Sequence, residues 1–118
     1  MRQLMLCAPI IAPMMASCSP VATINVVVRS NTHIEFNVAA NDGSPACIDY
    51  LTVRGVDSAF LWELRRVRNG IGCINRIVFP TVPDGFEAAS NQRSLTNGNY
   101  EVDVSASIYG GIARFHVP

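Results

Sequence analysis

Two of the four cysteines and both histidines of this 118-residue chain are the residues whose types best fit metal or redox chemistry. Cysteine and histidine side chains hold structural zinc ions, and the chain offers Cys47, Cys73, His33 and His116 for such a site. Such a site would require both histidines to converge on the cysteines, and no Cys-x-x-Cys pair is present. His116 instead lies between Phe115 and Val117, and His33 directly precedes Ile34, in segments that we expect to be strands. We therefore predict no metal site and ordinary strand positions for both histidines.

Other catalytic side-chain types are present, but they form no recognisable arrangement. A serine hydrolase needs an activated serine with a histidine and an acid, and no Gly-x-Ser-x-Gly elbow occurs. The acidic residues lack the spacing of a calcium-binding loop; they include Asp42, Asp84, Glu87 and Asp103. We predict no cofactor and no enzymatic activity. The least favoured alternative is an enzyme or inhibitor of unfamiliar type that depends on His33 or His116.

Charge is balanced along the chain, with nine basic and nine acidic residues and a formal net charge of zero. Nucleic-acid binding depends on a basic face that neutralises phosphates, so we predict no nucleic-acid partner. Arg65, Arg66 and Arg68 form the only local basic run. One interpretation is a surface contact for anionic envelope components such as lipid headgroups or sugar phosphates. The favoured interpretation is a solvated strand end that also protects a sheet edge from pairing.

The N-terminal segment has the three parts of a secretory signal. Arg2 gives a positive start, an apolar run follows from Leu4 to Ala16, and small residues close it. The run is too short to span about 30 Å of hydrocarbon as a helix, and Pro9 and Pro13 interrupt it. We predict a signal peptide over residues 1–17. The alternative is a buried N-terminal strand or helix of a cytosolic protein.

The leader ends with Met15, Ala16, Ser17 and Cys18. This segment resembles the lipobox of bacterial lipoproteins, in which a cysteine follows small residues and becomes the lipidated first residue of the mature chain; the family prefers leucine where this chain has Met15. The resemblance implies lipidation of Cys18 and attachment to a membrane through that anchor. The resemblance also implies that Ser19, as the second residue of the mature chain, permits transfer to the outer membrane. The alternative is ordinary cleavage after Ala16, Ser17 or Cys18, which would release a soluble periplasmic or secreted protein.

Cys47 and Cys73 are the cysteines that remain when Cys7 leaves with the leader and Cys18 carries the lipid. In an exported chain such a pair is most economically interpreted as a disulfide, and only one connectivity is possible. Closing a loop of about 27 residues stabilises the fold by roughly 3.5 kcal/mol on the chain-entropy model. We predict a structural bridge in an oxidising compartment of the bacterial envelope. If Cys18 is not lipidated, a third thiol needs a partner.

Beyond Cys18, short segments rich in Val, Ile, Thr, Tyr and Phe alternate with clusters of turn residues. No segment indicates a helix. Alternation of period two predicts strands over residues 24–28, 34–38, 47–54, 60–65, 74–82, 100–108 and 113–117. About seven short strands in one domain over residues 18–118 favour an all-β fold, an antiparallel β-sandwich, over a small closed barrel.

Three details of this pattern concern the core and the connections. Phe60, Trp62 and Leu64 fall on one face of their strand, which predicts Trp62 at the centre of the core. Residues 84–96 form the most loop-like stretch. Gly110–Gly111 is expected to turn the chain into its last strand.

The segment from Leu95 to Val102 reads Leu-Thr-Asn-Gly-Asn-Tyr-Glu-Val. It resembles the Leu-x-x-Gly-x-Tyr-x-Val signature of the penultimate strand in immunoglobulin-like and fibronectin-type domains. The resemblance implies that Tyr100 is a corner residue whose hydroxyl bonds back to the upstream backbone. Trp62 also resembles the buried tryptophan of immunoglobulin domains. The family's second cysteine is absent, because Val102 occupies its position, so the standard disulfide is not implied and no function is named.

The spacing from Trp62 to Tyr100 also resembles that of small uncharacterised bacterial envelope lipoproteins. Three functions are consistent with these patterns. The first is a nonenzymatic, lipid-anchored immunoglobulin-like sandwich with an adhesion, assembly or accessory role and an unknown envelope protein as partner. The second is a soluble periplasmic domain that binds a small ligand or carbohydrate, for which a deep apolar cleft near Trp62 would be favourable. The third is the unfamiliar enzyme or inhibitor named above.

Overall fold

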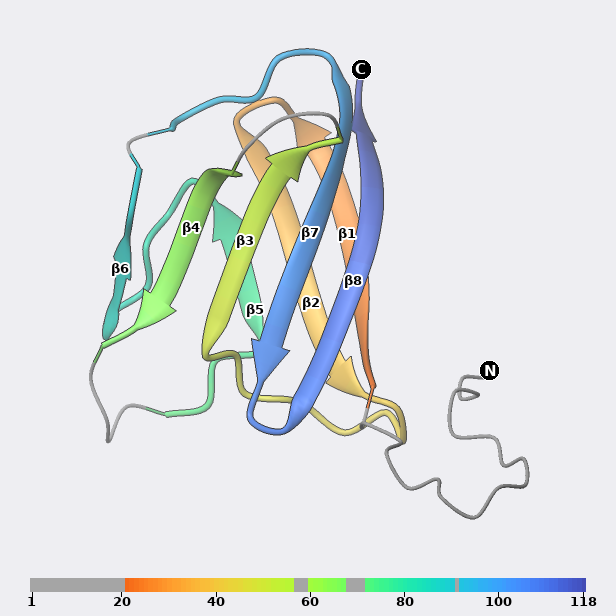
Figure 1. Cartoon of the computed structure of the whole chain (residues 1–118), viewed down its shortest axis with the longest axis vertical. Helices are drawn as coiled ribbons and strands as arrows, with labels where there is room; N and C mark the ends of the chain where they lie inside the picture. Colours follow the sequence, from red (N-terminus) through yellow and green to blue (C-terminus); the bar gives the residue numbers. More distant parts are fainter. Residues whose placement is uncertain (1–20, 57–59, 68–71, 91) are drawn as a thin grey trace.

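The computed structural model describes residues 21–56, 60–67, 72–90 and 92–118. Within these residues eight strands form two antiparallel sheets, which pack face to face as the two layers of a sandwich (Figure 1). One sheet has the order β1-β2-β5 and the other the order β6-β4-β3-β7-β8. The strands are β1 (Ala22–Ser30), β2 (His33–Ala40), β3 (Tyr50–Gly55), β4 (Phe60–Arg66), β5 (Arg76–Phe79), β6 (Phe86–Ala88), β7 (Gly98–Ala106) and β8 (Tyr109–Val117). The predicted all-β antiparallel sandwich is confirmed.

The core lies between the two sheets and is built by the alternation of the strands. Ile34 and Phe36 on β2 and Val102 on β7 are completely buried in one cluster, and Phe36 meets Phe115 on β8 edge to face with ring centroids 5.6 Å apart. Trp62 on β4 and Phe79 on β5 meet edge to face with ring centroids 4.9 Å apart, so they join the two sheets. Burying each large apolar side chain of this kind stabilises the fold by about 1.5–3 kcal/mol.

One side of the sandwich is closed where β1 runs along β8. Val21 forms a parallel bridge with Gly110, and an added Cβ on Gly111 would lie 2.6 Å from the carbonyl oxygen of Ala22. Only glycine permits this approach of the two backbones. The prediction that Gly110–Gly111 forms a turn is therefore wrong, because both glycines lie within β8 and make room for β1.

The turn between β7 and β8 lies instead at Ser107 and Ile108. Ser107 has a φ of 60°, an uncommon value for a residue with a side chain. Its backbone N–H donates to Oδ2 of Asp49 at 2.8 Å, and the N–H of Asp49 donates to the carbonyl of Ser105. Asp49 thus holds the turn from the neighbouring connection, and Ile108 is displayed at the tip.

A β-bulge in β4 changes the direction of Phe60. Trp62 pairs with Val53, but Phe60 rather than Leu61 pairs with Arg54, so Leu61 is the additional residue. Residues paired across two strands face the same side, and Arg54 faces outward. Phe60 is therefore 60% exposed while Trp62 is 1% exposed. The prediction that Phe60 shares the inward face of Trp62 is wrong.

The predicted loop over residues 84–96 contains a short strand, β6, which pairs with the end of β4. With only three residues, β6 offers too little alternation to be detected in the sequence. The expected strand over 74–82 is shorter than predicted, because β5 spans only Arg76–Phe79. No helix in the described part of the chain is long and apolar enough to cross a membrane.

Candidate contact surfaces

Cys47 and Cys73 form a disulfide, with Cα atoms 4.9 Å apart. Cys47 lies in the connection between β2 and β3, and Cys73 lies shortly before β5, so the bond joins two connections that each lead from one sheet to the other. The adjacent N–H of Ile48 donates to the carbonyl of Ile74 at 2.8 Å. The predicted disulfide is confirmed and indicates a compartment outside the reducing cytosol. Two bonded sulfurs are not thiolates, which removes them as ligands of a zinc site.

The disulfide defines one end of the sandwich, which also contains the β7–β8 turn and the start of β1 (Figure 1). We call it the disulfide end. The opposite end contains the end of β3, the start of β4 and the start of β7, and we call it the corner end. Tyr100 lies there, buried, with its ring stacked on Phe115 at 5.6 Å between centroids. Its hydroxyl donates to the carbonyl of Thr96 at 2.6 Å, as the immunoglobulin-like resemblance implies.

A groove of about 470 Å³ lies beside Trp62, on the side of the sandwich between the β5–β6 connection and the segment after β6. Its walls mix apolar and polar groups: Pro80, Val82, Ser90, Gln92 and Arg93. Trp62 reaches it only at the floor, because the side chain is almost completely buried. The indole face is consequently occupied by core contacts, and the groove is not the apolar cleft that would favour ligand stacking on Trp62.

A second groove, of about 530 Å³, opens at the corner end. It lies between Val56 and Leu61 on one side and the segment that leads into β7 on the other. That segment contributes Asn97 and Asn99, whose amides donate and accept hydrogen bonds. The corner end therefore combines a hollow, amide groups and exposed apolar side chains, which include Val56 and Phe60.

The basic run divides into residues with different environments. Arg65 is exposed and pairs with Glu87 across β4 and β6, with Nη2 and Oε2 3.2 Å apart. Arg66 has only 16% of its side chain exposed; it pairs with Asp49 at 3.2 Å and places its guanidinium 5.3 Å from the ring centroid of Phe86. Arg68 lies outside the described residues, as do the leader and Cys18. Arg66 therefore has a structural role, and a contact with anionic components through this run stays a prediction.

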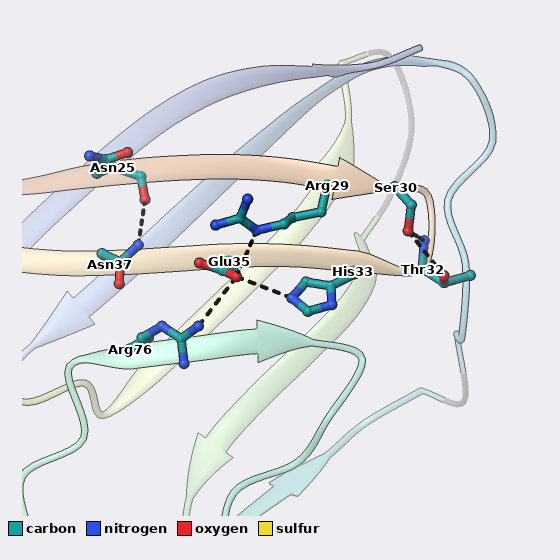
Figure 2. Close-up of polar contacts among 8 residues, drawn as sticks. All are labelled: Asn25, Arg29, Ser30, Thr32, His33, Glu35, Asn37 and Arg76. Carbon is teal, nitrogen blue, oxygen red and sulfur yellow. Dashed lines mark hydrogen bonds and ion pairs between the residues drawn. The ribbon is translucent and has the colours of Figure 1, made fainter.

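Sequence reasoning missed a polar cluster on the outer face of the three-stranded sheet (Figure 2). Nε of Arg29 and Nε2 of His33 each lie 3.1 Å from Oε2 of Glu35, and Nη2 of Arg76 lies 3.3 Å from the same oxygen. These residues come from β1, β2 and β5, and Arg29 occupies the irregular step in the β1–β2 register. Alternation alone places Glu35 outward, but its partners follow only from the order of the strands.

Electrostatics around Glu35 favours its ionised form. The hydrogen bond from Arg29, followed by that from His33, lowers the pKa of Glu35, and desolvation opposes them. All three contacts are made to Oε2, and only 10% of the Glu35 side chain is exposed. The cluster links three strands through this one oxygen. His33 is consequently a strand residue whose ring hydrogen-bonds Glu35.

The outer face of the five-stranded sheet has a second ionic group around Glu101 on β7. Nε of Arg54 donates to Oε1 of Glu101 at 3.0 Å, and Nε of Arg114 lies 3.5 Å from Oε2. The Arg54 hydrogen bond lowers the pKa of Glu101, whereas burial followed by repulsion from Glu101 raises the pKa of Asp103. His116, on β8, shares a hydrogen bond with Oδ1 of Asn99 at 2.9 Å. His33 and His116 therefore belong to different sheets.

Within the ranges that the structure describes, no group of three or more His, Cys, Asp or Glu side chains is arranged to hold a metal ion. The chemistry that these surfaces offer is recognition through amides, ion pairs and exposed apolar groups. Comparison of the chain with protein-family models, with curated proteins and with solved structures finds no match. The fold and the disulfide define the class, a disulfide-bonded all-β sandwich.

Proposed function

We propose that this chain is an exported, lipid-anchored β-sandwich of a bacterial cell envelope with a nonenzymatic adhesion, assembly or accessory role. The observation that carries the proposal is the Cys47–Cys73 disulfide, which suits an oxidising compartment and agrees with a leader that ends at Cys18. Acyl chains on Cys18 would hold the domain, since each buried methylene contributes about 0.8 kcal/mol. The sandwich would then present its loops and outer faces to an envelope protein.

Metabolic labelling with palmitate in a bacterial host tests the anchor. We expect the wild-type chain to be labelled and the Cys18→Ala variant to be unlabelled and released from membranes. Cys7→Ala is the matched control, because Cys7 lies inside the leader, and it should keep the label. An unlabelled wild-type chain, or a label that persists in Cys18→Ala, would refute the proposal. Crosslinking in the native envelope would then identify the partner.

A second candidate is a soluble periplasmic domain that binds a small ligand or carbohydrate. The groove at the corner end supports it, because Asn97 and Asn99 supply amides beside the apolar Val56 and Leu61. Screening the secreted domain against soluble glycans should then give binding that Asn97→Ala reduces and Gln92→Ala, in the groove beside Trp62, leaves unchanged. Equal loss in both variants would contradict this candidate.

A further inference from the structure

The point at which the chain joins the sandwich is close to the β7–β8 turn. Val21 bridges to Gly110, and the carbonyl of Ala22 lies against Gly111, so the first described residues pack on the start of β8. Ile108 precedes Gly110 by two positions, at the tip of the turn. Figure 1 shows this turn and the start of β1 at the same end of the molecule.

Covalent geometry limits how far this end can lie from an anchor at Cys18. Only Ser19 and Pro20 separate Cys18 from Val21, and three steps between Cα atoms span at most about 11 Å. Acyl chains on Cys18 must lie in the hydrocarbon, which keeps the cysteine at the lipid headgroups. Val21, and with it the β7–β8 turn, is therefore confined to the immediate vicinity of the lipid surface.

The turn displays an apolar side chain in a rigid frame. Ile108 is 71% exposed, although turns generally select small or polar residues. The neighbouring Ser107 N–H is held by Asp49, whose carboxylate is paired with Arg66 at 3.2 Å. Because the turn is already ordered, burying Ile108 in another phase costs little additional conformational entropy. Val67, after β4, is a second exposed apolar residue at this end.

The charges at the disulfide end favour an apolar contact. Two acidic groups lie near the start of β1 and the turn: Asp49, which is paired with Arg66, and Asp42, whose pKa is lowered by a hydrogen bond from the hydroxyl of Ser44. The charges of Asp49 and Arg66 offset each other, and the carboxylate of Asp42 disfavours attraction to anionic headgroups. A surface made of neutral lipid, which accepts Ile108 at the boundary between headgroups and acyl chains, fits this end better.

We infer that the β7–β8 turn inserts Ile108 into the lipid surface beside the acyl anchor, so that the disulfide end faces the membrane and the corner end faces away from it. This inference rests on the proposed acylation of Cys18. It assigns the two ends different roles: the disulfide end contacts lipid through a fixed apolar tip, and the corner end, with its groove, is left free for a partner.

Fluorescence from two matched variants tests this orientation. Ile108→Trp and Phe60→Trp each add one tryptophan at an exposed position of opposite ends, and the native Trp62, buried in the core, provides a constant background. The full-length acylated proteins are reconstituted in phosphatidylcholine vesicles whose acyl chains are brominated. We expect most of the added fluorescence of Ile108→Trp to be quenched, and that of Phe60→Trp to remain. Raised salt should leave the difference unchanged.

The outcomes separate the inference from the proposal beneath it. If intact mass shows the acyl chains but both variants are quenched equally, or Ile108→Trp is not quenched, the inference is overturned and the proposed acylation of Cys18 stands. Intact mass without acyl chains overturns both. Hydrogen exchange of the unsubstituted protein gives an independent measurement: vesicles should slow the amides around Ile108 more than those around Val56, and the reverse order contradicts the orientation.

Discussion

The two ends of the sandwich are held by different interactions. At the disulfide end a covalent bond joins the connection between β2 and β3 to the connection between β4 and β5, and Asp49 links the β7–β8 turn to Arg66. At the corner end the hydroxyl of Tyr100 joins the start of β7 to the backbone of Thr96, and the N–H of Leu95 donates to the carbonyl of Asn31 in the turn between β1 and β2. Both ends therefore link parts of the two sheets, by a covalent bond at the first and by hydrogen bonds at the second.

The two kinds of link differ in strength. A covalent crosslink limits the conformational freedom of the unfolded chain and contributes roughly 3.5 kcal/mol for a loop of this length. A corner hydrogen bond contributes about 1 kcal/mol, and it lies beside the groove at that end. Substitutions at each end test whether the two ends differ in this way, and the substitution with the largest expected effect on stability comes first.

The largest effect is expected from removal of the disulfide. The double variant Cys47→Ser with Cys73→Ser should lower the free energy of unfolding by about 3.5 kcal/mol, because its unfolded chain regains the entropy of the open loop. Equilibrium denaturation in urea measures the loss, and the wild-type chain under a reducing agent is the control. A loss no larger than that of Tyr100→Phe at the corner end would show that the two ends do not differ in this way.

A smaller effect is expected at the corner. Tyr100→Phe keeps the ring stacked on Phe115 but leaves the carbonyl of Thr96 without its hydroxyl donor, so the free energy of unfolding should fall by about 1 kcal/mol. The same urea experiment measures it. Tyr109→Phe, a half-buried tyrosine at the disulfide end, is the matched control and should change less. Equal losses in the two variants would show that the corner bond does not stabilise the fold.

The smallest effects concern one carboxyl near each end, Glu101 and Asp42, whose pKa values are both lowered in the fold: that of Glu101 by Arg54, and that of Asp42 by Ser44. Each stabilises the native state above the ordinary carboxyl pKa of about 4, and the contribution is lost as pH falls through the lowered pKa. Thermal unfolding between neutral and acidic pH should therefore show a flatter dependence in Glu101→Gln and in Asp42→Asn.

Asp103 supplies a control of opposite sign for these two variants. Its pKa is raised, chiefly by burial, so its contribution is present below the ordinary pKa and is lost as pH rises through the raised value. The Asp103→Asn variant should gain more stability between acidic and neutral pH than the wild type gains. If Asp103→Asn and Glu101→Gln shift the profile in the same direction, the assigned charge environment of β7 is wrong.

Part of the fold could be predicted from the sequence because the relevant forces act within a strand. Alternation on β2 and β7 identified the faces that carry Phe36 and Val102, and the pairing of Cys47 with Cys73 required only a count of cysteines. The bulge that turns Phe60 outward could not be predicted, since it depends on the register between β3 and β4. The role of Gly111 likewise depends on the approach of β1, which is remote in sequence.

The candidate surfaces were less predictable than the fold. Only the basic run was visible in the sequence, and it separated into an exposed Arg65 and a largely buried Arg66 once β6 placed Phe86 under the guanidinium. The Glu35 cluster and both grooves arise between segments that are far apart along the chain. Their existence depends on strand order, which period-two patterns do not contain.

The class of fold and the alternation that buries one face of each long strand follow from residue type and spacing within single segments, and the bonded cysteine pair follows from the number of cysteines left after the leader. Which residues meet depends on tertiary structure: the two guanidinium groups and the imidazole around Glu35, the end at which Ile108 and the start of β1 lie together, and the outward direction of Phe60. Packing and register bring together strands that are far apart in the sequence, and no single segment contains that information.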